Sequence, residues 1–485
     1  MAIFIILGIP LLLAIGALFV RRERLFGIIN CFGYFLVLCA SAAIFKETAF
    51  AGHIKAFSNF IYLDLLSAVF ITVISVVAFA AALYSIGYIR KDIEQKIISE
   101  RKARFYYLLF NLFCFSMFCV PAVNNLGLLW VAIEMTTLIS AFLVGFYNSK
   151  ESVEAAWKYI IICSVGIIFA LLGTILFSYA FSISGLSKSL NWSEMVPVAH
   201  ILDKNILRIA FIFILVGYGT KAGLAPMHTW LPDAHSQAVA PISALLSGVL
   251  LKTAIYAILR FGIIIIKSGE LAYFTHLMIL FGVISLVISS GFILVQKDLK
   301  RLLAYSSIEH IGIISIGFGL GSPLAIAGAI LHVFNHAVAK SLMFFGAGNI
   351  VRVYKKHNMN AIRGVIKALP FTGIMALLGV FALTGFAPFS IFISEMMIIM
   401  AAFTNGSYLI AALLLLCLGV IFGAFIFHFG KMLFGNLPKG MTVIGEPLSG
   451  KLAFLFLFFL ICGVGIVLVF KNKDLLWLAQ RLLQG

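Results

Sequence analysis

Apolar runs of about twenty residues recur from one end of this 485-residue sequence to the other. A helix of that length crosses the hydrocarbon core of a bilayer. Hydrophobic residues make up 63% of the chain and charged residues only 11%. The longest polar interval, about Lys188–Lys204, is too short to form a soluble domain. The sequence therefore predicts an all-α polytopic membrane protein.

Hydropathy predicts about fourteen membrane spans. Their approximate ranges are 2–20, 25–45, 61–84, 104–120, 123–147, 155–180, 206–230, 239–262, 271–294, 301–320, 324–350, 369–402, 407–430 and 452–470. The first span is followed by Arg21 and Arg22, so that by its position and composition it could be a signal peptide. It has no basic leading region and no small-residue cleavage site, so we interpret it as a span.

Basic residues set the predicted orientation. The odd-numbered loops, such as Arg90–Arg104 and Arg352–Lys367, hold about 22 Lys and Arg, against about 10 in the even loops and the tail. Cytoplasmic loops carry such an excess. We therefore expect a multi-pass protein of the inner (cytoplasmic) membrane with both termini on the outer side. The same loops explain the formal charge of +17 without nucleic acid.

The seventh span is expected to be broken. Lys221 lies in it at membrane depth, and Gly223 and Pro226 follow directly. Proline removes a backbone donor and clashes with the preceding turn. Open backbone and a charge inside a bilayer are tolerated only against protein or a wet cavity, so this stretch is a candidate transport site.

The break has a partner in the twelfth span. Gly223-Leu-Ala-Pro226-Met recurs there as Gly385-Phe-Ala-Pro388-Phe, with Glu395 about two turns later. The breaks are five spans apart, and an odd offset inverts one five-helix unit relative to the other. The predicted parts are an N-terminal three-helix segment (1–103), two inverted repeats (104–262 and 271–430) and a last span with a short tail (452–485). Two kinks without functional consequence are the simpler alternative.

Few charges are left for the membrane interior. Those inside spans are Lys221, Lys252, Lys340, Glu134 and Glu395, while Glu309 and Asp64 lie nearer span ends. Each buried charge costs about 2.5–3.5 kcal/mol on insertion scales, so a chain that only had to fold would use leucine. A Glu134–Lys221 pair that separates would change the proton affinity of the lysine, with Lys252 as the next carrier. A permanent ion pair that only fixes helix packing is the alternative.

The eleventh span carries His332, His336 and Lys340 at four-residue spacing, which places them on one helix face. Imidazole exchanges protons near neutral pH and can relay them. Metal binding by His332 and His336 is disfavoured, because no glutamate or cysteine accompanies them. Histidines satisfied within the core are the stronger alternative.

Five further residues give weaker signals. They are His228, Asp233, Glu309, His310 and His428. A single histidine near a helix end is usually structural or interfacial. Asp233 and His235 follow the first break and could form a mouth of a proton path.

The sequence lacks the motifs that several kinds of chemistry require. All seven cysteines lie in apolar segments without a Cys-x-x-Cys pair, and there is no phosphate-binding or dinucleotide-binding loop. We expect no bound cofactor, metal or nucleotide, and no catalytic centre within the chain. Any redox chemistry that drives transport would take place in another subunit.

The motifs together resemble one known family. They are Glu134, Thr220–His235, Lys252, Ala304–Gly312 and the series His332, His336, Lys340. The chain resembles the antiporter-like, proton-translocating membrane subunits of complex I, membrane-bound hydrogenases and Mrp-type antiporters. Trp130–Leu138, Glu154–Ile167 and Glu309 are most similar to the F-type component of hydrogenase-4 and formate hydrogenlyase-like complexes.

The resemblance implies a fourteen-helix core with inverted repeats and a buried hydrated axis. It implies that Glu134 and Lys221 form the first pair and that Glu395 is the exit-side residue. Lys252, His332, His336 and Lys340 would connect them. It also implies other membrane subunits as partners and, through them, a soluble redox arm.

Three other functions remain open at this point. One is a Na⁺/H⁺ antiporter subunit, which would use the same buried pairs. Another is the membrane subunit of an inorganic-carbon uptake complex with a soluble zinc-bearing partner. The third is a haem-bearing oxidoreductase that uses His228, His310 or His332 as an axial ligand.

Overall fold

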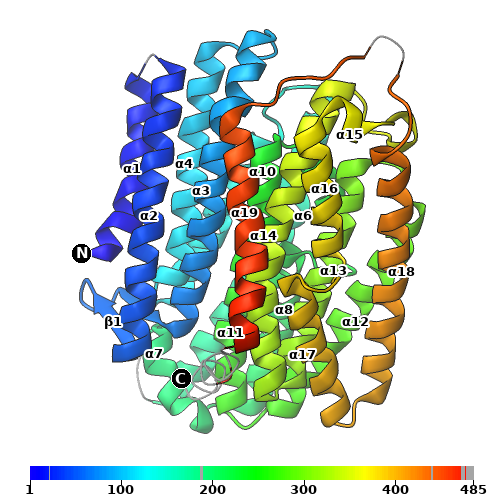
Figure 1. Cartoon of the computed structure of the whole chain (residues 1–485). Coiled ribbons are helices and arrows are strands. Elements are labelled where there is room, and N and C mark those ends of the chain that lie inside the picture. The colour runs from blue at the N-terminus through cyan, green and yellow to red at the C-terminus, as the bar shows by residue number, and fades with distance from the viewer. Residues whose placement is uncertain (21, 186–188, 439–440, 471–475, 477–485) are drawn as a thin grey trace.

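The computed structural model describes the chain except residues 21, 186–188, 439–440, 471–475 and 477–485 (Figure 1). The tail of the predicted C-terminal part therefore lies almost wholly outside the described residues. The first half contains α1 (Ala2–Phe19), α2 (Glu23–Ala51), β1 (His53–Ala56), β2 (Ile61–Asp64), α3 (Leu65–Glu94), α4 (Glu100–Ala122), α5 (Leu126–Val144), α6 (Lys150–Ile183), α7 (Trp192–Met195), η1 (Val196–Ile201), α8 (Lys204–Ala222) and α9 (Trp230–Gln237).

The second half continues the bundle. It contains α10 (Ala240–Leu245), η2 (Leu246–Leu250), α11 (Leu251–Lys267), α12 (Leu271–Val295), α13 (Leu299–Leu320), α14 (Pro323–Tyr354), η3 (Met359–Ala361), α15 (Val365–Ala368), α16 (Pro370–Leu383), α17 (Ser390–Thr404), α18 (Tyr408–Leu433) and α19 (Leu448–Phe470). A long linker carries the chain from α18 over the end of the bundle, and α19 then packs against α3 and α14 in the centre (Figure 1).

Within the described residues, twelve helices are long and apolar enough to cross a membrane. One of these is the continuous stretch Ala240–Lys267, made of α10, η2 and α11. Three further apolar helices are shorter: Pro370–Leu383, Ser390–Thr404 and Leu448–Val464. The chain is thus a multi-pass, α-helical membrane protein, as the sequence predicts.

The most polar spans are the most buried. In α13 and α14 the mean hydropathy is only 1.3 and 1.2, and 94% of each span is buried inside the protein. In α18 and α1 the mean hydropathy is 3.0 and 2.8, and only 33% of each span is buried. Helices that carry ionisable residues therefore form the centre of the bundle, and apolar helices surround them. This is the arrangement that a bilayer imposes on charged residues.

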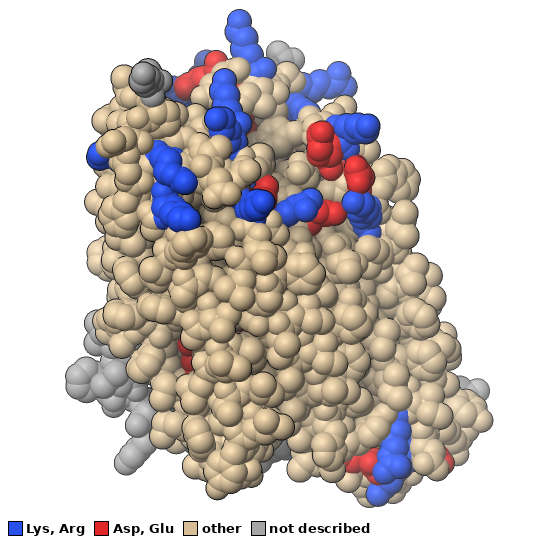
Figure 2. All heavy atoms as spheres, turned by 90° about the vertical axis from the view of Figure 1, so that its right-hand side faces the viewer, with Lys and Arg blue, Asp and Glu red and all other residues tan. Residues whose placement is uncertain are grey.

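Charges on the surface gather at the two ends. On the face shown in Figure 2, lysine and arginine concentrate at the upper end, and a broad band almost free of charge lies below them. A band of this kind is expected where the protein faces hydrocarbon. The basic end is the one that the sequence analysis assigns to the cytoplasm, and that assignment stays a prediction.

Both predicted helix breaks are present. α8 ends at Gly223, whose φ of +80° is left-handed, and α9 resumes at Trp230. α16 is followed by Gly385, with φ +64°, and α17 begins at Ser390. The peptide bonds before Pro226 and Pro388 are both cis. Glycine suits both positions, because left-handed backbone disfavours any residue with a Cβ.

Three local features differ from the sequence-based expectation. Residues 61–64 pair with His53–Ala56 in a β-hairpin, and the third helix begins only at Leu65, capped by the Asp64 carboxylate. The predicted eighth span contains a π-helical turn, Leu246–Leu250. The polar interval after α6 forms the short helices α7 and η1. Each is too short to leave a hydrophobic period that could be recognised in the sequence.

Candidate functional site in the centre of the bundle

The lysine before the first break is completely buried. Lys221 Nζ donates hydrogen bonds to Thr137 Oγ1 on α5 (2.8 Å) and to the Tyr159 hydroxyl on α6 (2.5 Å). The ammonium also lies 4.7 Å from the centroid of the Tyr159 ring. The Tyr159 hydroxyl makes a further bond to Ser140 Oγ (2.7 Å). A buried cation requires such partners, and here they are neutral hydroxyl groups.

Glu134 is near Lys221 but does not form an ion pair with it. Its Oε1 accepts a hydrogen bond from Ser164 Oγ (3.2 Å), and its Oε2 is buried without a partner. Lys221 is within electrostatic range of this carboxylate. The hydrogen-bond partners of Lys221 are therefore Thr137 and Tyr159, and that of Glu134 is Ser164. Neither partner of the lysine was a candidate in the sequence, because a hydroxyl in a span carries no signal of its own.

An aromatic side chain stands between this first cluster and the rest of the site. Trp230, the first residue of α9, donates from Nε1 to the Thr220 carbonyl (2.8 Å). Its ring lies 4.7 Å from that of Tyr159 and 6.4 Å from that of His235. His235 is completely buried, both its ring nitrogens lack partners, and it stacks on Phe344. The sequence predicts His235 at a mouth of the proton path, whereas in the structure it is buried inside the bundle.

Two further buried lysines bind backbone carbonyls. Lys252 Nζ donates to the Ser247 carbonyl at 2.5 Å. Ser247 lies in the π-helical turn, five residues before Lys252 in the same continuous helix. Lys340 Nζ donates to the Leu303 carbonyl (2.7 Å) and to the Ser306 hydroxyl. Both lysines are within electrostatic range of His235, which connects the first break to the second half of the bundle.

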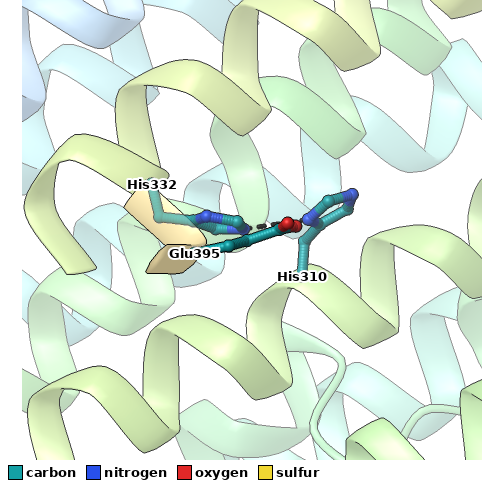
Figure 3. A group of neighbouring side chains, drawn as sticks. All are labelled: His310, His332 and Glu395. Carbon is teal, nitrogen blue, oxygen red and sulfur yellow. Dashed lines mark hydrogen bonds between the residues drawn. The ribbon is translucent and has the colours of Figure 1, made fainter. Parts of the chain in front are cut away.

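Three histidines meet in the second half. His310 Nδ1 lies 2.9 Å from His332 Nε2 (Figure 3). The ring centroids of His310 and His336 are 4.5 Å apart. His336 is buried, and both its nitrogens lack partners. His310 was a weaker candidate in the sequence, because it belongs to a different helix from His332 and His336. The structure places it between them.

The hydrogen bonds of Ser394 fix the histidine tautomers. Its hydroxyl donates to the Ile391 carbonyl (2.8 Å) and therefore accepts from His332 Nδ1 (2.9 Å). His332 Nε2 is then the acceptor for His310 Nδ1, and His310 Nε2 carries a lone pair that has no partner. This network gives the histidine pair a direction, with a free acceptor at one end and a donor at the other.

Glu395 completes this second cluster from the other side of the break. Its Oε1 is buried without a partner, and a Cβ added to Gly385 would overlap its carboxylate. The breaking glycine thus makes room for the acid. The carboxylate faces the His310–His332 contact (Figure 3). Glu309 is also buried, has an unpartnered Oε2, and is within electrostatic range of Lys340 and Glu395.

The remaining weaker candidates lie outside these clusters. His228 is buried near Tyr305 and its Nδ1 has no partner. Asp233 forms surface ion pairs with Lys158 (3.2 Å) and Arg301 (2.6 Å). His428 Nε2 lies 3.2 Å from the Leu294 carbonyl on the periphery. The structure does not bring these three residues together.

Further buried charges escaped the sequence analysis, which expected only three basic residues in the interior. Arg260 forms a two-pronged pair with Asp64, with both N–O distances 2.6 Å. Arg352 pairs with Asp92 (2.8 Å), and Lys300 donates to the Ala238 carbonyl (2.9 Å). They lie toward helix ends, where charge in a sequence is ordinarily assigned to loops. Their partners come from distant helices, so only the fold reveals that they are buried.

Comparisons with known proteins show the family to which the chain belongs. Residues 123–421 match the family described as "NADH:quinone oxidoreductase/Mrp antiporter, TM", and residues 56–106 match "NADH-Ubiquinone oxidoreductase (complex I), chain 5 N-terminus". The chain is 40% identical over 384 residues to the hydrogenase-4 component F homolog of Methylacidiphilum infernorum, covering 79% of this chain and 80% of that protein.

Two more similarities extend the comparison. Hydrogenase-4 component B of Escherichia coli (strain K12) is 32% identical over 346 residues, which span 69% of this chain but only 49% of that protein. A subunit of an archaeal membrane-bound sulfane sulfur reductase superposes with a TM-score of 0.86 at 24% identity, covering 100% of this chain and 97% of that one. The chain therefore belongs to the family of antiporter-like membrane subunits found in complex I, hydrogenase-4 and Mrp-type complexes.

Proposed function

We propose that this chain translocates protons as a subunit of a membrane-bound redox complex of the hydrogenase-4, formate hydrogenlyase or complex I type. The observation that carries the proposal is the series of buried ionisable side chains in the two most polar, most buried spans and their neighbours. The proposed carriers are Glu134, Lys221, Lys252, His332, His336, Lys340 and Glu395, of which Glu134 is half-buried and the other six are buried. His235 and His310 join them, because they occupy the spaces between the predicted carriers.

The two clusters are proposed to be equivalent sites of two inverted repeats, within 104–262 and 271–430. Thr137 and His310 each lie eleven residues after the first residue of their helices, α5 and α13. Tyr159 and His332 each lie nine residues after the first residue of α6 and α14. Thr137 and Tyr159 both contact Lys221. His310 and His332 both lie close to Glu395. This correspondence supports the repeat more strongly than the short sequence echo does.

The same architecture would contain fourteen spans. The twelve long helices would be joined by α16 and α17, as the two halves of the broken span, and by α19. The N-terminal three-helix segment (1–103) and the last span with its tail (452–485) flank the repeats. We place the basic end in the cytoplasm and both termini outside, following the excess of lysine and arginine in the odd loops.

The first step is proposed to be a change in the Glu134–Lys221 distance. In this state Lys221 is held by two hydroxyl groups and Glu134 by Ser164. A charge that changes in a neighbouring subunit would draw the two together or drive them apart. In a low-dielectric interior such a displacement changes the proton affinity of the ammonium strongly. A proton released from Lys221 would then pass Trp230 toward His235 and Lys252.

The second step is proposed to follow the histidine network. His310 Nε2 offers a free lone pair on the side of His336, whose ring is its near neighbour. A proton accepted there would release the proton on Nδ1 to His332 Nε2, and Glu395 lies against that contact. Imidazoles relay protons in this way by exchanging donor and acceptor nitrogens. The carboxylate of Glu395 would then release the proton on the exit side.

The driving energy is assigned to other subunits. Moving one charge against 100 mV costs about 2.3 kcal/mol, so redox energy must reach the chain through its membrane partners. The similarity to the hydrogenase-4 component F homolog supports a complex of that type. We therefore expect the chain to bind further membrane subunits and, through them, a soluble redox arm.

The proposal is tested in the purified parent complex, reconstituted into vesicles and energised by its electron donor. We expect Lys221→Ala to abolish proton translocation per electron transferred. Lys431→Ala is the matched control, because that lysine is exposed on α18 and lies over Phe427 outside both clusters. Normal proton-to-electron ratios in the Lys221→Ala complex would overturn the assignment.

A Na⁺/H⁺ antiporter subunit is the second candidate, supported by the Mrp antiporters that the matched family description names. It would use the same buried pairs without an electron donor. Vesicles that exchange sodium for protons in the absence of any donor would favour it. The proteins that co-purify in mild detergent separate both candidates from an inorganic-carbon uptake complex, which would bring a soluble zinc-bearing partner.

A further inference from the structure

The second cluster contains three metal-binding side chains that converge from three helices. We propose that His310, His332 and Glu395 form a binding site for one transition-metal ion of the zinc class, and that the ion blocks the site. One ligand atom from each residue can be chosen so that all three lie within 4.8 Å of one another (Figure 3). The chain's sequence does not suggest this set, because its ligands are 22 or more residues apart and come from α13, α14 and α17.

The spacing is close to what a metal ion requires. Two nitrogens bound to tetrahedral zinc at about 2.0–2.1 Å lie about 3.3 Å apart. The two imidazole nitrogens here are 2.9 Å apart. Their separation would have to grow by about 0.4 Å, while the Glu395 carboxylate moves inward. The ion would replace the single proton that the two rings now share.

The ligand set has the composition of an open zinc site. Two histidines and one glutamate bind zinc in several enzymes and leave a fourth position for water. Glu395 Oε1 has no hydrogen-bond partner, so a metal would satisfy an oxygen that the protein leaves unpaired. Imidazole and carboxylate together favour zinc and its first-row neighbours over sodium, calcium or magnesium, which prefer sets of oxygens.

An outer partner already orients one of the ligands. Ser394 accepts from His332 Nδ1, which leaves the Nε2 lone pair directed at His310. A hydrogen bond of this kind, from the non-ligating nitrogen, is characteristic of metal-bound histidine. Asn335 in turn donates to the carbonyl of Ser390, the first residue of α17. The ligands are therefore held by the helices that carry them.

The second break lies beside the site. Gly385 lies against the Glu395 carboxylate, and Phe386, the next residue in the broken segment, is 48% exposed. The cluster beside the first break holds the ammonium of Lys221, among Thr137 and Tyr159. One cluster thus contains its own cation, whereas the second presents ligands for one.

The binding test uses the full chain purified in detergent, with Co²⁺ as the probe because its visible spectrum reports coordination number. We expect one equivalent of Co²⁺ to give an intense four- or five-coordinate band, which Zn²⁺ removes. His310→Gln and Glu395→Gln should each abolish the band. Ser394→Ala should weaken Co²⁺ binding about 10–100-fold, as loss of an outer partner usually does.

Two variants make the test selective. His276→Gln changes an exposed histidine on α12 and should leave the band unchanged. His336→Gln should also retain it, which distinguishes this site from one built on His332 and His336 along a single helix. Gel filtration and thermal melting show that each variant is folded. A band that survives in folded His310→Gln and Glu395→Gln, or no band in the unsubstituted chain, would overturn the site.

The consequence for transport rests on the proposed function. In vesicles that contain the parent complex, Zn²⁺ should stop proton translocation, and a chelator should restore it. Glu395→Gln cannot serve in this arm, because the proposed function uses Glu395, so the ion is varied instead: Mg²⁺, which prefers oxygen ligands, should leave translocation unchanged. The Co²⁺ spectrum does not depend on translocation. Failure of the metal site and failure of the proposed function therefore give different results.

Discussion

Lys221 and Tyr159 are joined by a hydrogen bond of 2.5 Å, in which the ammonium donates to the phenol hydroxyl. The carboxylate of Glu134 is close but binds Ser164 instead. A lysine held by neutral hydroxyl groups can exchange its proton without breaking a buried ion pair, which is costly to separate. The function proposed for the chain depends on this arrangement.

The Tyr159 hydroxyl provides the first prediction. Tyr159→Phe removes one acceptor from a buried ammonium and keeps the ring. A hydrogen bond to a charged group contributes about 1.5–3 kcal/mol, and about 1.4 kcal/mol corresponds to a tenfold change. We expect proton translocation by the parent complex to fall about tenfold or more. Tyr179→Phe, at a site 54% exposed on the same helix, is the control. Equal rates for the two variants would contradict the role of Tyr159.

Trp230 provides the second prediction. Its indole lies between Tyr159 and His235 and is tied to the Thr220 carbonyl. Trp230→Ala should leave space for water between the two clusters, so vesicles should leak protons without an electron donor. Because loss of a buried tryptophan costs about 3–5 kcal/mol of stability, Trp230→Phe is the milder companion. It should leak less than Trp230→Ala and more than the unsubstituted protein, measured by a pH-sensitive dye inside the vesicles.

Gly385 provides the third prediction. A Cβ at this position would overlap the Glu395 carboxylate, and the backbone φ is +64°. Gly385→Ala should lower the thermal unfolding temperature and also reduce translocation, because Glu395 must move. Gly419→Ala is the matched control for Gly385→Ala. Gly419 lies in the middle of α18, and nothing lies within 4 Å of a Cβ added there. That variant should be neutral or slightly stabilising, by up to about 1 kcal/mol. If both variants melt alike, the steric account of the second break fails.

The fourth prediction compares two ion pairs. Arg260 and Asp64 have side chains only 4% and 18% exposed, whereas those of Arg90 and Glu94, which also form an ion pair, are 48% and 55% exposed. Removing one partner of a buried pair costs about 3–5 kcal/mol, because the other charge stays buried and unpaired. Removing one partner of an exposed pair costs about 0–1 kcal/mol.

We therefore expect Arg260→Ala to lower the free energy of unfolding, measured by SDS titration in mixed micelles, far more than Arg90→Ala does. Arg260 also lies 4.2 Å from the Trp192 ring, which a smaller side chain would leave uncovered. Asp64→Asn keeps the size of the acid and tests the charge alone. A loss of less than about 1 kcal/mol in both Arg260→Ala and Asp64→Asn would show that this pair does not hold the hairpin to α11.

The sequence was a good guide to elements with strong periodic signals. Long apolar runs predicted the spans, and Pro226 and Pro388 with their glycines predicted both breaks within a few residues. It was a poor guide to short elements such as the hairpin at His53 and the π-helical turn before Lys252. The hairpin depends on backbone pairing between two four-residue strands, and a single π-helical turn is too short to leave a pattern in a window of residues.

Candidate site residues follow the same division. Lys221, Lys252 and Glu395 stand out in sequence because charge in a span is costly. Thr137 and Tyr159 do not, because hydroxyl groups are common in membrane helices, and His310 was undervalued because it looked isolated. Arg260 was missed because charge near the end of a span resembles charge in a loop.

What the sequence alone determined is chemical: which side chains carry charge within apolar runs, and where the backbone cannot continue a helix. What the tertiary structure decided is which of these side chains meet. Helices distant in sequence bring Lys221 to Tyr159, Arg260 to Asp64 and His310 to His332. The physical reason is that the cost of a buried charge depends on the charge itself, whereas its partners depend on how the helices pack.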